Sequence, residues 1–236
     1  MKRFLLSSLI LALVIMLVAE IVLPRGLEQI AAKVVAARFN DADVTRVSVR
    51  SRPALKMLRG QFDLIRVEIE GLDTGVLFVD RIVSQLVDVR LNPVSLVTQG
   101  RLEMIEGSVS TTLSLSEAAL DRHVSENIPI LGNGRVSIST GGITVTGDLL
   151  LGGRKLGVSL TGGFLQSGER ELAFKINTIS IEGVNIPRQF TDALLSSLGG
   201  DTFVVDLSGV PVEGGVTDVW TTAGQLHITF SQTVRP

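Results

Sequence analysis

The chain has 236 residues, a formal net charge of −2 at pH 7, no Cys and no Tyr. The lack of Cys excludes disulfides, thiol catalysis and thiolate metal sites, and the balanced charge argues against a general nucleic-acid binder. Because 45% of the residues are hydrophobic and only 19% are charged, the chain is aliphatic enough to build a folded core.

The first predicted element is a membrane segment. Lys2 and Arg3 precede an apolar run over residues 4–23, and about 20 such residues match the hydrocarbon core of a bilayer. We expect residues 1–23 to be a transmembrane anchor or a signal segment. The sequence at 17–19 offers only one of the two small residues that a cleavage site needs, which favours the anchor.

The rest of the chain, residues 24–236, is predicted to be one exported domain in the cell envelope, either anchored or secreted. Residues 25–39 carry apolar side chains at steps of three and four, as in an amphipathic helix. Further along, the period changes to two, which indicates half-buried strands. Such alternation covers residues 65–69, 109–115, 143–147, 174–178 and 226–230.

Turn signals separate these strands every 10 to 15 residues or so, which predicts a largely antiparallel sheet. Three more helices are expected, at 53–59 before Gly60, at 117–126 with Ser116 as N-cap, and at 187–198. Glycines inside the strand patterns permit bends. The predicted fold is therefore α+β, with a strongly curled sheet wrapped around helix 25–39; a flat meander with helices on one face is the alternative.

Residues suited to chemistry are few. His123 is expected on a solvated helix face and His227 on the outer side of a strand. No HExxH, GxSxG or phosphate-loop pattern occurs. We therefore predict no catalytic residue, no metal site and no cofactor, and a protein that is not an enzyme.

A basic stretch lies between residues 46 and 66, where Asp63 is the only acid before Arg66. Its cations alternate with apolar residues such as Leu55 and Leu58, so the stretch could place charges on anionic headgroups and apolar side chains at the acyl boundary. A solvated loop with a short helix is the alternative. The predicted headgroup or membrane contacts are Arg50, Arg52, Lys56 and Arg59.

Several strands are apolar on both faces, for instance around Ile82, Val83 and Leu86. Either a second layer covers both faces, or one face lines an apolar cavity.

Several segments in this order resemble the LmeA-like exported phospholipid-binding proteins. The segments are PALKMLRGQFD at 53–63, IRVEI at 65–69, LSLSEAAL at 113–120, GVPVEGGV at 209–216 and GQLHI at 224–228. The resemblance implies a curled sheet around a helix, similar to tubular lipid-binding domains. It also implies phospholipid binding in a bacterial cell envelope.

The leading hypothesis is a lipid-binding module whose partners are phospholipid and a membrane surface, with any protein partner unknown. Acyl chains would enter a groove between the curled sheet and the first helix. One rival is a structural envelope protein with a fully packed core and a protein partner, and another is a lipid hydrolase that uses His123 or His227. The predicted groove residues are Ile65, Val67, Ile69, Leu113, Leu115, Phe174, Ile176, Leu226, Ile228 and Phe230.

Overall fold

The computed structural model describes residues 20, 22–33, 35–36, 42–75, 77–92, 103–127, 131–151, 154–185 and 202–235. The chain forms two compact units. Unit 1 comprises Met1–Ile69, Val83–Ser110 and Gln232–Pro236, and unit 2 comprises Glu70–Ile82 and Thr111–Ser231. Strands β2, β3, β4 and β12 contribute residues to both units, so the predicted single domain over 24–236 stays a prediction.

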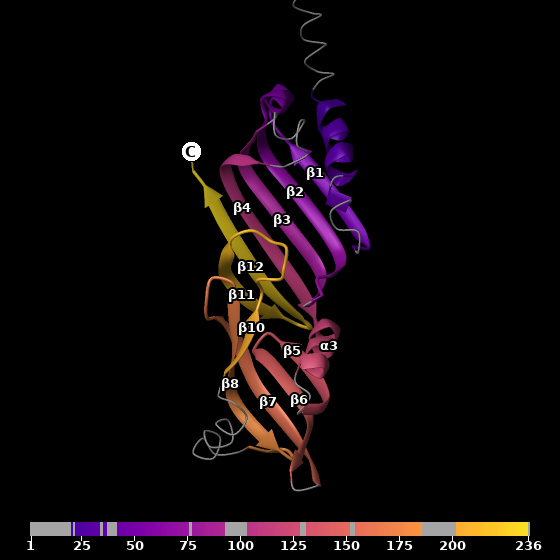
Figure 1. The fold of residues 1–236 in the computed structure, drawn as a ribbon, viewed down its shortest axis with the longest axis vertical. Coiled ribbons are helices and arrows are strands. Elements are labelled where there is room, and N and C mark those ends of the chain that lie inside the picture. Colours follow the sequence, from indigo (N-terminus) through magenta and orange to yellow (C-terminus); the bar gives the residue numbers. More distant parts are fainter. Residues whose placement is uncertain are drawn as a thin grey trace, which may run out of the picture. The chain divides into compact units, whose positions relative to one another are not determined.

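The described residues form an α+β fold in which strands dominate (Figure 1). Hydrogen-bonded neighbours follow the order β1-β2-β3-β4-β12-β11 in one sheet and β10-β8-β7-β6-β5 in the other, with β9 beside β8. The sheets are mostly antiparallel, as predicted. The strands are β1 (Val44–Arg50), β2 (Gln61–Asp73), β3 (Phe78–Leu91), β4 (Met104–Ser116), β5 (Leu131–Ser139), β6 (Gly142–Leu151), β7 (Arg154–Gln166), β8 (Glu171–Ile181), β9 (Val184–Asn185), β10 (Thr202–Asp206), β11 (Gly215–Thr222) and β12 (Gln225–Val234).

In unit 1, residues 22–33 are helical, as predicted for the start of the 25–39 helix. Leu23 and Leu27 pack against a buried cluster from the strands and the short helix that follows β1. The Val49 N–H of β1 donates to Glu28 Oε1 at 2.9 Å, which satisfies a strand donor with a helix side chain. The buried members of the cluster are Val49, Met57, Phe62, Val89 and Leu91.

The helix predicted at 53–59 is present as the 3-10 helix η1 (Ala54–Arg59). Gly60 ends it in the left-handed conformation, with φ of 73°, and its N–H donates to the Met57 carbonyl at 2.9 Å. A residue without Cβ adopts this conformation at no steric cost, which explains why the helix ends here.

In unit 2, the predicted helix at 117–126 is confirmed as α3 (Glu117–Asn127). Ser116 caps it as expected, because its Oγ accepts the Ala119 N–H at 3.3 Å. The Glu117 carboxylate accepts the Ile138 N–H at 2.6 Å, and Asp121 accepts the Val136 N–H. Both donors belong to β5, so α3 covers the outer edge of that strand.

The prediction of one strongly curled sheet around the first helix was wrong. The strands form two open sheets that are neither strongly curled nor closed. After β4 the chain enters α3 and then starts a new ladder at β5, so a single sheet never forms. The glycines that suggested general curling act locally: Gly162 follows a register shift in the β7–β8 ladder, whereas Gly163 has open space where a Cβ would lie.

Two predicted elements fall on residues outside those described: the helix at 187–198 and nearly all of the membrane segment at 1–23. Glu20 and Leu23, at the end of that segment, contact other parts of unit 1, and Glu20 Oε1 accepts the Ala54 N–H at 2.8 Å. Among the described residues, no helix combines the length and apolar character needed to cross a bilayer.

Gly162 provides a test of the close strand approach at the register shift between β7 and β8. A Cβ at this position would overlap the Lys175 carbonyl oxygen of β8. We expect Gly162→Ala to lower the free energy of unfolding by about 1–3 kcal/mol, because the two strands must separate. Gly163→Ala is the matched control, since nothing lies within 4 Å of its Cβ position. Urea denaturation measures the free energy of unfolding of both variants. Equal values for the two variants would contradict the close approach of the two strands at Gly162.

Candidate functional site

The candidate site is an apolar cavity of about 220 Å3 that lies entirely within unit 2. Its walls come from α3, from β4 and β12, and from every strand of the second sheet except β9. The lining residues are Leu77, Leu115, Leu120, His123, Val124, Leu131, Val136, Ile143, Val145, Leu160, Phe164, Leu172, Phe174, Val204, Val205, Leu207, Leu226 and Ile228.

Strand alternation explains why these side chains share one face. In the ladder, Val145 of β6 is paired with Leu160 of β7, and both line the cavity. The neighbouring pair Thr144 and Thr161 belongs to the opposite face, where the two hydroxyls lie 3.2 Å apart. The period of two therefore separates an apolar inner face from a polar outer face.

Two aromatic rings form part of the wall. Phe164 and Phe174 are paired across β7 and β8, with ring centroids 5.2 Å apart and planes at 58°. This tilted arrangement is a favourable one for aromatic pairs. It fixes the position of two large apolar surfaces beside the cavity.

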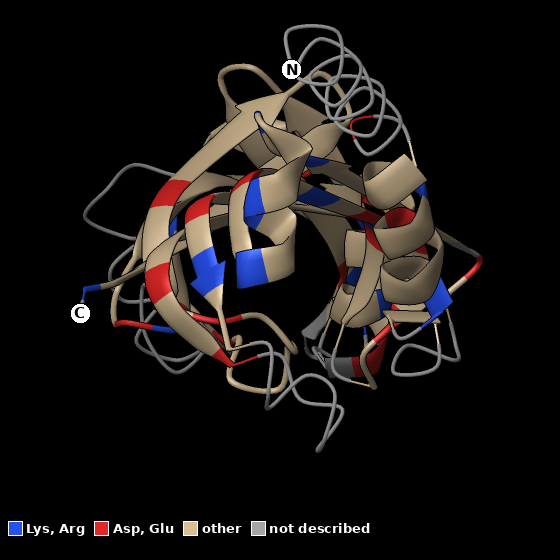
Figure 2. Cartoon of the chain, turned by 90° about the horizontal axis from the view of Figure 1, so that it is seen from above, with Lys and Arg blue, Asp and Glu red and all other residues tan. Residues whose placement is uncertain are grey.

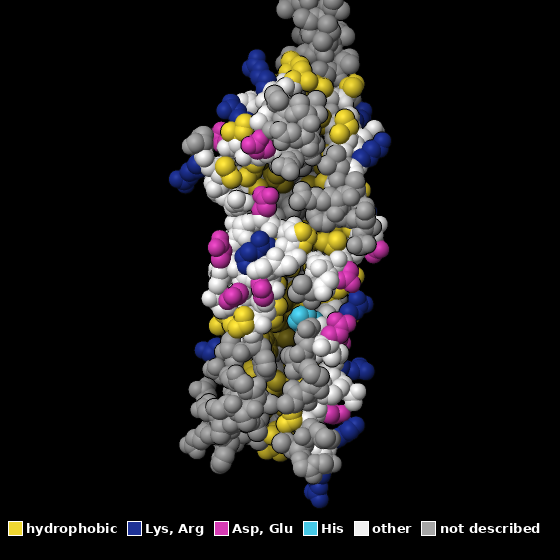
Figure 3. Space-filling view, in the orientation of Figure 1, with side chains coloured by type: hydrophobic (Ala, Val, Ile, Leu, Met, Phe, Trp, Pro, Cys, Tyr) yellow, Lys and Arg dark blue, Asp and Glu magenta, His cyan; other side chains and the backbone are white. Residues whose placement is uncertain are grey.

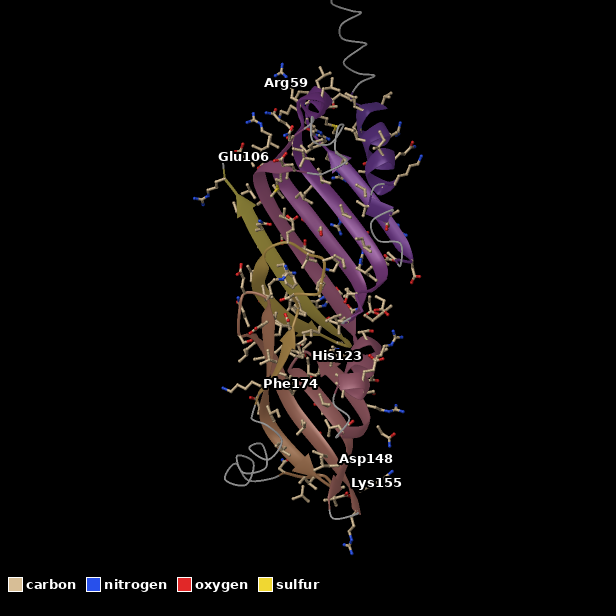
Figure 4. The ribbon with its side chains drawn as sticks, viewed as in Figure 1. Arg59, Glu106, His123, Asp148, Lys155 and Phe174 are labelled. Atoms are coloured by element: carbon tan, nitrogen blue, oxygen red, sulfur yellow. The ribbon has the colours of Figure 1, made fainter. Side chains whose placement is uncertain are left out.

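His123 is the one side chain with polar atoms among the described lining residues. We expected it on a solvated helix face, but it is half-buried and lines the cavity (Figure 4). The signal for this placement was present in the sequence. Leu120 and Val124 lie three residues before and one residue after His123, so all three belong to the side of α3 that the apolar spacing turns inward.

The predicted groove residues are divided between the two units. Leu115, Phe174, Leu226 and Ile228 line the cavity. The rest are absent from the described lining: Leu113, Ile176 and Phe230 are buried elsewhere in unit 2, and Ile65, Val67 and Ile69 belong to unit 1. The helix that lines this cavity is α3, whereas the predicted groove lies against the first helix, so that groove stays a prediction.

The predicted headgroup contacts cluster around η1 in unit 1 (Figure 2 shows the charged positions). Arg50, Arg52 and Arg59 are exposed. Lys56 is half-buried, and its Nζ lies 3.4 Å from Asp63 Oδ1.

Asp63 holds the start of η1 in place. The Arg52 backbone N–H donates to Asp63 Oδ2 at 2.7 Å. This hydrogen bond and, to a smaller extent, the Lys56 ammonium lower the pKa of the Asp63 carboxyl. Asp63 therefore stays ionised, and its carboxylate offsets the positive charge of the Lys56 ammonium.

Apolar side chains are exposed between these cations. Leu58 is 64% exposed and Leu55 is 41% exposed, whereas Ala54 and Met57 of the same helix are buried. The short helix thus presents two leucines and Arg59 to its surroundings, and the membrane contact itself stays a prediction.

His227 lies on the outer face of β12, opposite Leu226 and Ile228, as predicted. Its Nδ1 is 3.0 Å from Ser114 Oγ, its Nε2 is 2.9 Å from Thr222 Oγ1, and Trp220 stacks on the ring with centroids 5.1 Å apart. Partial burial lowers the pKa of His227.

This cluster lacks the third member of a Ser-His-acid triad, because no carboxylate among the described residues hydrogen-bonds to His227. Nor do the described residues contain a group of three His, Asp or Glu side chains able to hold a metal ion. The absence of enzyme activity and of a metal stays a prediction.

The family model of LmeA-like phospholipid-binding proteins matches residues 18–231. The chain belongs to this family. The match covers both units and confirms the resemblance seen in the sequence. No curated protein and no solved structure gave a match. The family's description names a ligand class and no reaction.

Proposed function

We propose that the chain binds phospholipid by taking acyl chain into the unit 2 cavity. The observation that carries the proposal is a cavity of about 220 Å3 whose described lining is apolar apart from His123. Membership of a phospholipid-binding family supports the same ligand class.

The energetics favour an aliphatic guest. Each methylene removed from water contributes about 0.8 kcal/mol. Apolar cavities stay dry because water finds no hydrogen-bond partners in them. Leu115, Phe174, Leu226 and Ile228 would contact the guest directly, whereas the other predicted groove residues of unit 2 would support the wall.

Leu160→Trp tests whether the cavity is the lipid site. Leu160 is 3% exposed and lines the cavity, so a Trp side chain there would occupy the space of the acyl chain. We expect wild-type protein to retain phospholipid through purification, and Leu160→Trp to lose most of it. Lipid extraction followed by mass spectrometry measures the amount per protein.

Leu165→Trp is the matched control. Leu165 lies on the same strand, is 55% exposed and is absent from the described lining, so this variant should keep its lipid. Undiminished lipid in Leu160→Trp, or wild-type protein free of lipid, would contradict the proposal and favour a structural protein.

We propose further that η1 touches the membrane surface. Arg50, Arg52 and Arg59 would lie near anionic headgroups, each contributing about 1 kcal/mol, and Leu55 and Leu58 would reach the acyl boundary. Exposure of both leucines beside exposed arginines supports this orientation.

Vesicle binding tests the membrane contact. In protein beginning at Glu20, which keeps the contacts of Glu20 and Leu23 with unit 1, we expect Arg59→Gln to weaken binding to anionic vesicles about fivefold. Leu58→Asp should weaken it further. Val184→Asp is the control, because Val184 is an aliphatic residue exposed to a similar degree as Leu58, at 66%, but belongs to unit 2. Equal losses in all three variants would contradict a specific role for η1.

We propose, finally, that the protein acts in the cell envelope outside the cytoplasm, held by the segment over residues 1–23 or released after its cleavage. The apolar run behind Lys2 and Arg3 supports this. Protease added to spheroplasts should degrade the domain without lysis. Resistance until the cells are lysed would contradict export.

A further inference from the structure

We infer that the cavity takes one acyl chain, tail first, and that His123 hydrogen-bonds to the acceptor oxygen at the polar end of that chain. The oxygen belongs to a carboxylate or an ester carbonyl. This inference rests on the acyl-binding function proposed above and adds to it the number of chains, their direction and the residue that selects the head.

The volume sets the number of chains. An apolar cavity of about 150 Å3 accepts one benzene molecule, so by proportion the 220 Å3 found here has room for about nine carbon atoms. Pockets that enclose larger ligands span about 300–1,000 Å3. The space therefore fits part of one chain and not two chains side by side.

The distribution of polar atoms sets the direction. The described lining side chains other than His123 are aliphatic or Phe, so a polar head placed among them would lose its hydrogen bonds with water. His123 is half-buried, whereas Leu120 and Val124 beside it are buried at 7% exposure each. The polar side chain thus lies toward the open part of the lining.

A second lining residue is also open to solvent. Val204 of β10 is 59% exposed although it also lines the cavity. In the space-filling view, a histidine lies beside hydrophobic side chains at a hollow (Figure 3). An amphiphile that enters here leaves its head near His123 and its tail among Leu160, Phe164 and Phe174.

The charged neighbours of His123 on α3 have other contacts. Glu117 and Asp121 accept backbone N–H groups of β5. Arg122 lies 4.0 Å from Asp73 Oδ2, and its guanidinium is 5.2 Å from the centre of the Phe78 ring. Among the described residues of α3, His123 is the one that brings polar side-chain atoms to the cavity lining. Its imidazole has two ring nitrogens and carries an N–H donor in either tautomer.

The experiment compares three amphiphiles with the same tail. Dodecanoate and 1-dodecanol carry an oxygen that accepts a hydrogen bond, whereas dodecyltrimethylammonium carries none. With the full-length protein, we expect equilibrium dialysis to show dodecanoate and dodecanol binding about 2- to 12-fold more tightly than the ammonium compound.

Three variants test the role of His123. His123→Leu should remove the preference for an acceptor-bearing head while leaving tail binding in place. His123→Gln should restore much of the preference, because its amide also donates a hydrogen bond. His227→Leu is the control, since His227 lies on the outer face of β12 and is not among the described lining residues.

The possible outcomes distinguish a failure of this inference from a failure of the proposed function. Equal or tighter binding of the ammonium compound by wild-type protein would overturn the inference, because the α3 carboxylates would then select the head. A preference that persists in His123→Leu would also overturn it. In both cases acyl binding itself stands. Failure of all three probes to bind would overturn the inference and the proposed function together. The comparison of the three amphiphiles uses wild-type protein alone, so its result does not depend on whether any variant folds.

Discussion

The attachment of α3 to β5 is the contact on which the cavity depends. β5 is an edge strand, and its Val136 and Ile138 N–H groups would otherwise lack partners within the sheet. The Asp121 and Glu117 carboxylates accept them, and hydrogen bonds of this charge-assisted kind are stronger than neutral ones. The helix is thereby held with Leu120, His123 and Val124 along the cavity. Without α3, the inner face of the second sheet would lose one wall.

The cavity is costly to keep empty. At about 24 cal/mol for each Å3, a fully enclosed empty space of 220 Å3 would destabilise a fold by about 5 kcal/mol, which is an upper limit for a cavity that opens to solvent. That is comparable with the whole free energy of unfolding of many domains, which is about 5–15 kcal/mol. Simple substitutions of Val136 or Val145 by larger residues would fill such a space. An acyl chain bound in the cavity would supply the van der Waals contacts that the lining side chains lack. Binding of such a chain would explain why the space is not filled by larger side chains.

Local features of the fold could be predicted from the sequence, and the arrangement of the sheets could not. Alternation located most strands, Ser116 located the start of α3, and Gly60 located the end of η1. These signals involve neighbours within a few residues. The division into two sheets depends on which distant strands pair. Gly162 and Gly163 look alike in sequence, yet only Gly162 faces a carbonyl of the next strand.

The limit of prediction from sequence is clearer at the candidate site. Leu113 and Leu115 share one face of β4 and are buried at 0% and 1% exposure, but only Leu115 is among the described lining residues. Hydrophobicity predicts burial for both, whereas a cavity is a place where neighbouring side chains fail to meet. His123 was misplaced because a polar residue was assigned to solvent by type. In an aliphatic wall, one hydrogen-bond donor would give a bound amphiphile a direction, and our inference assigns this role to His123.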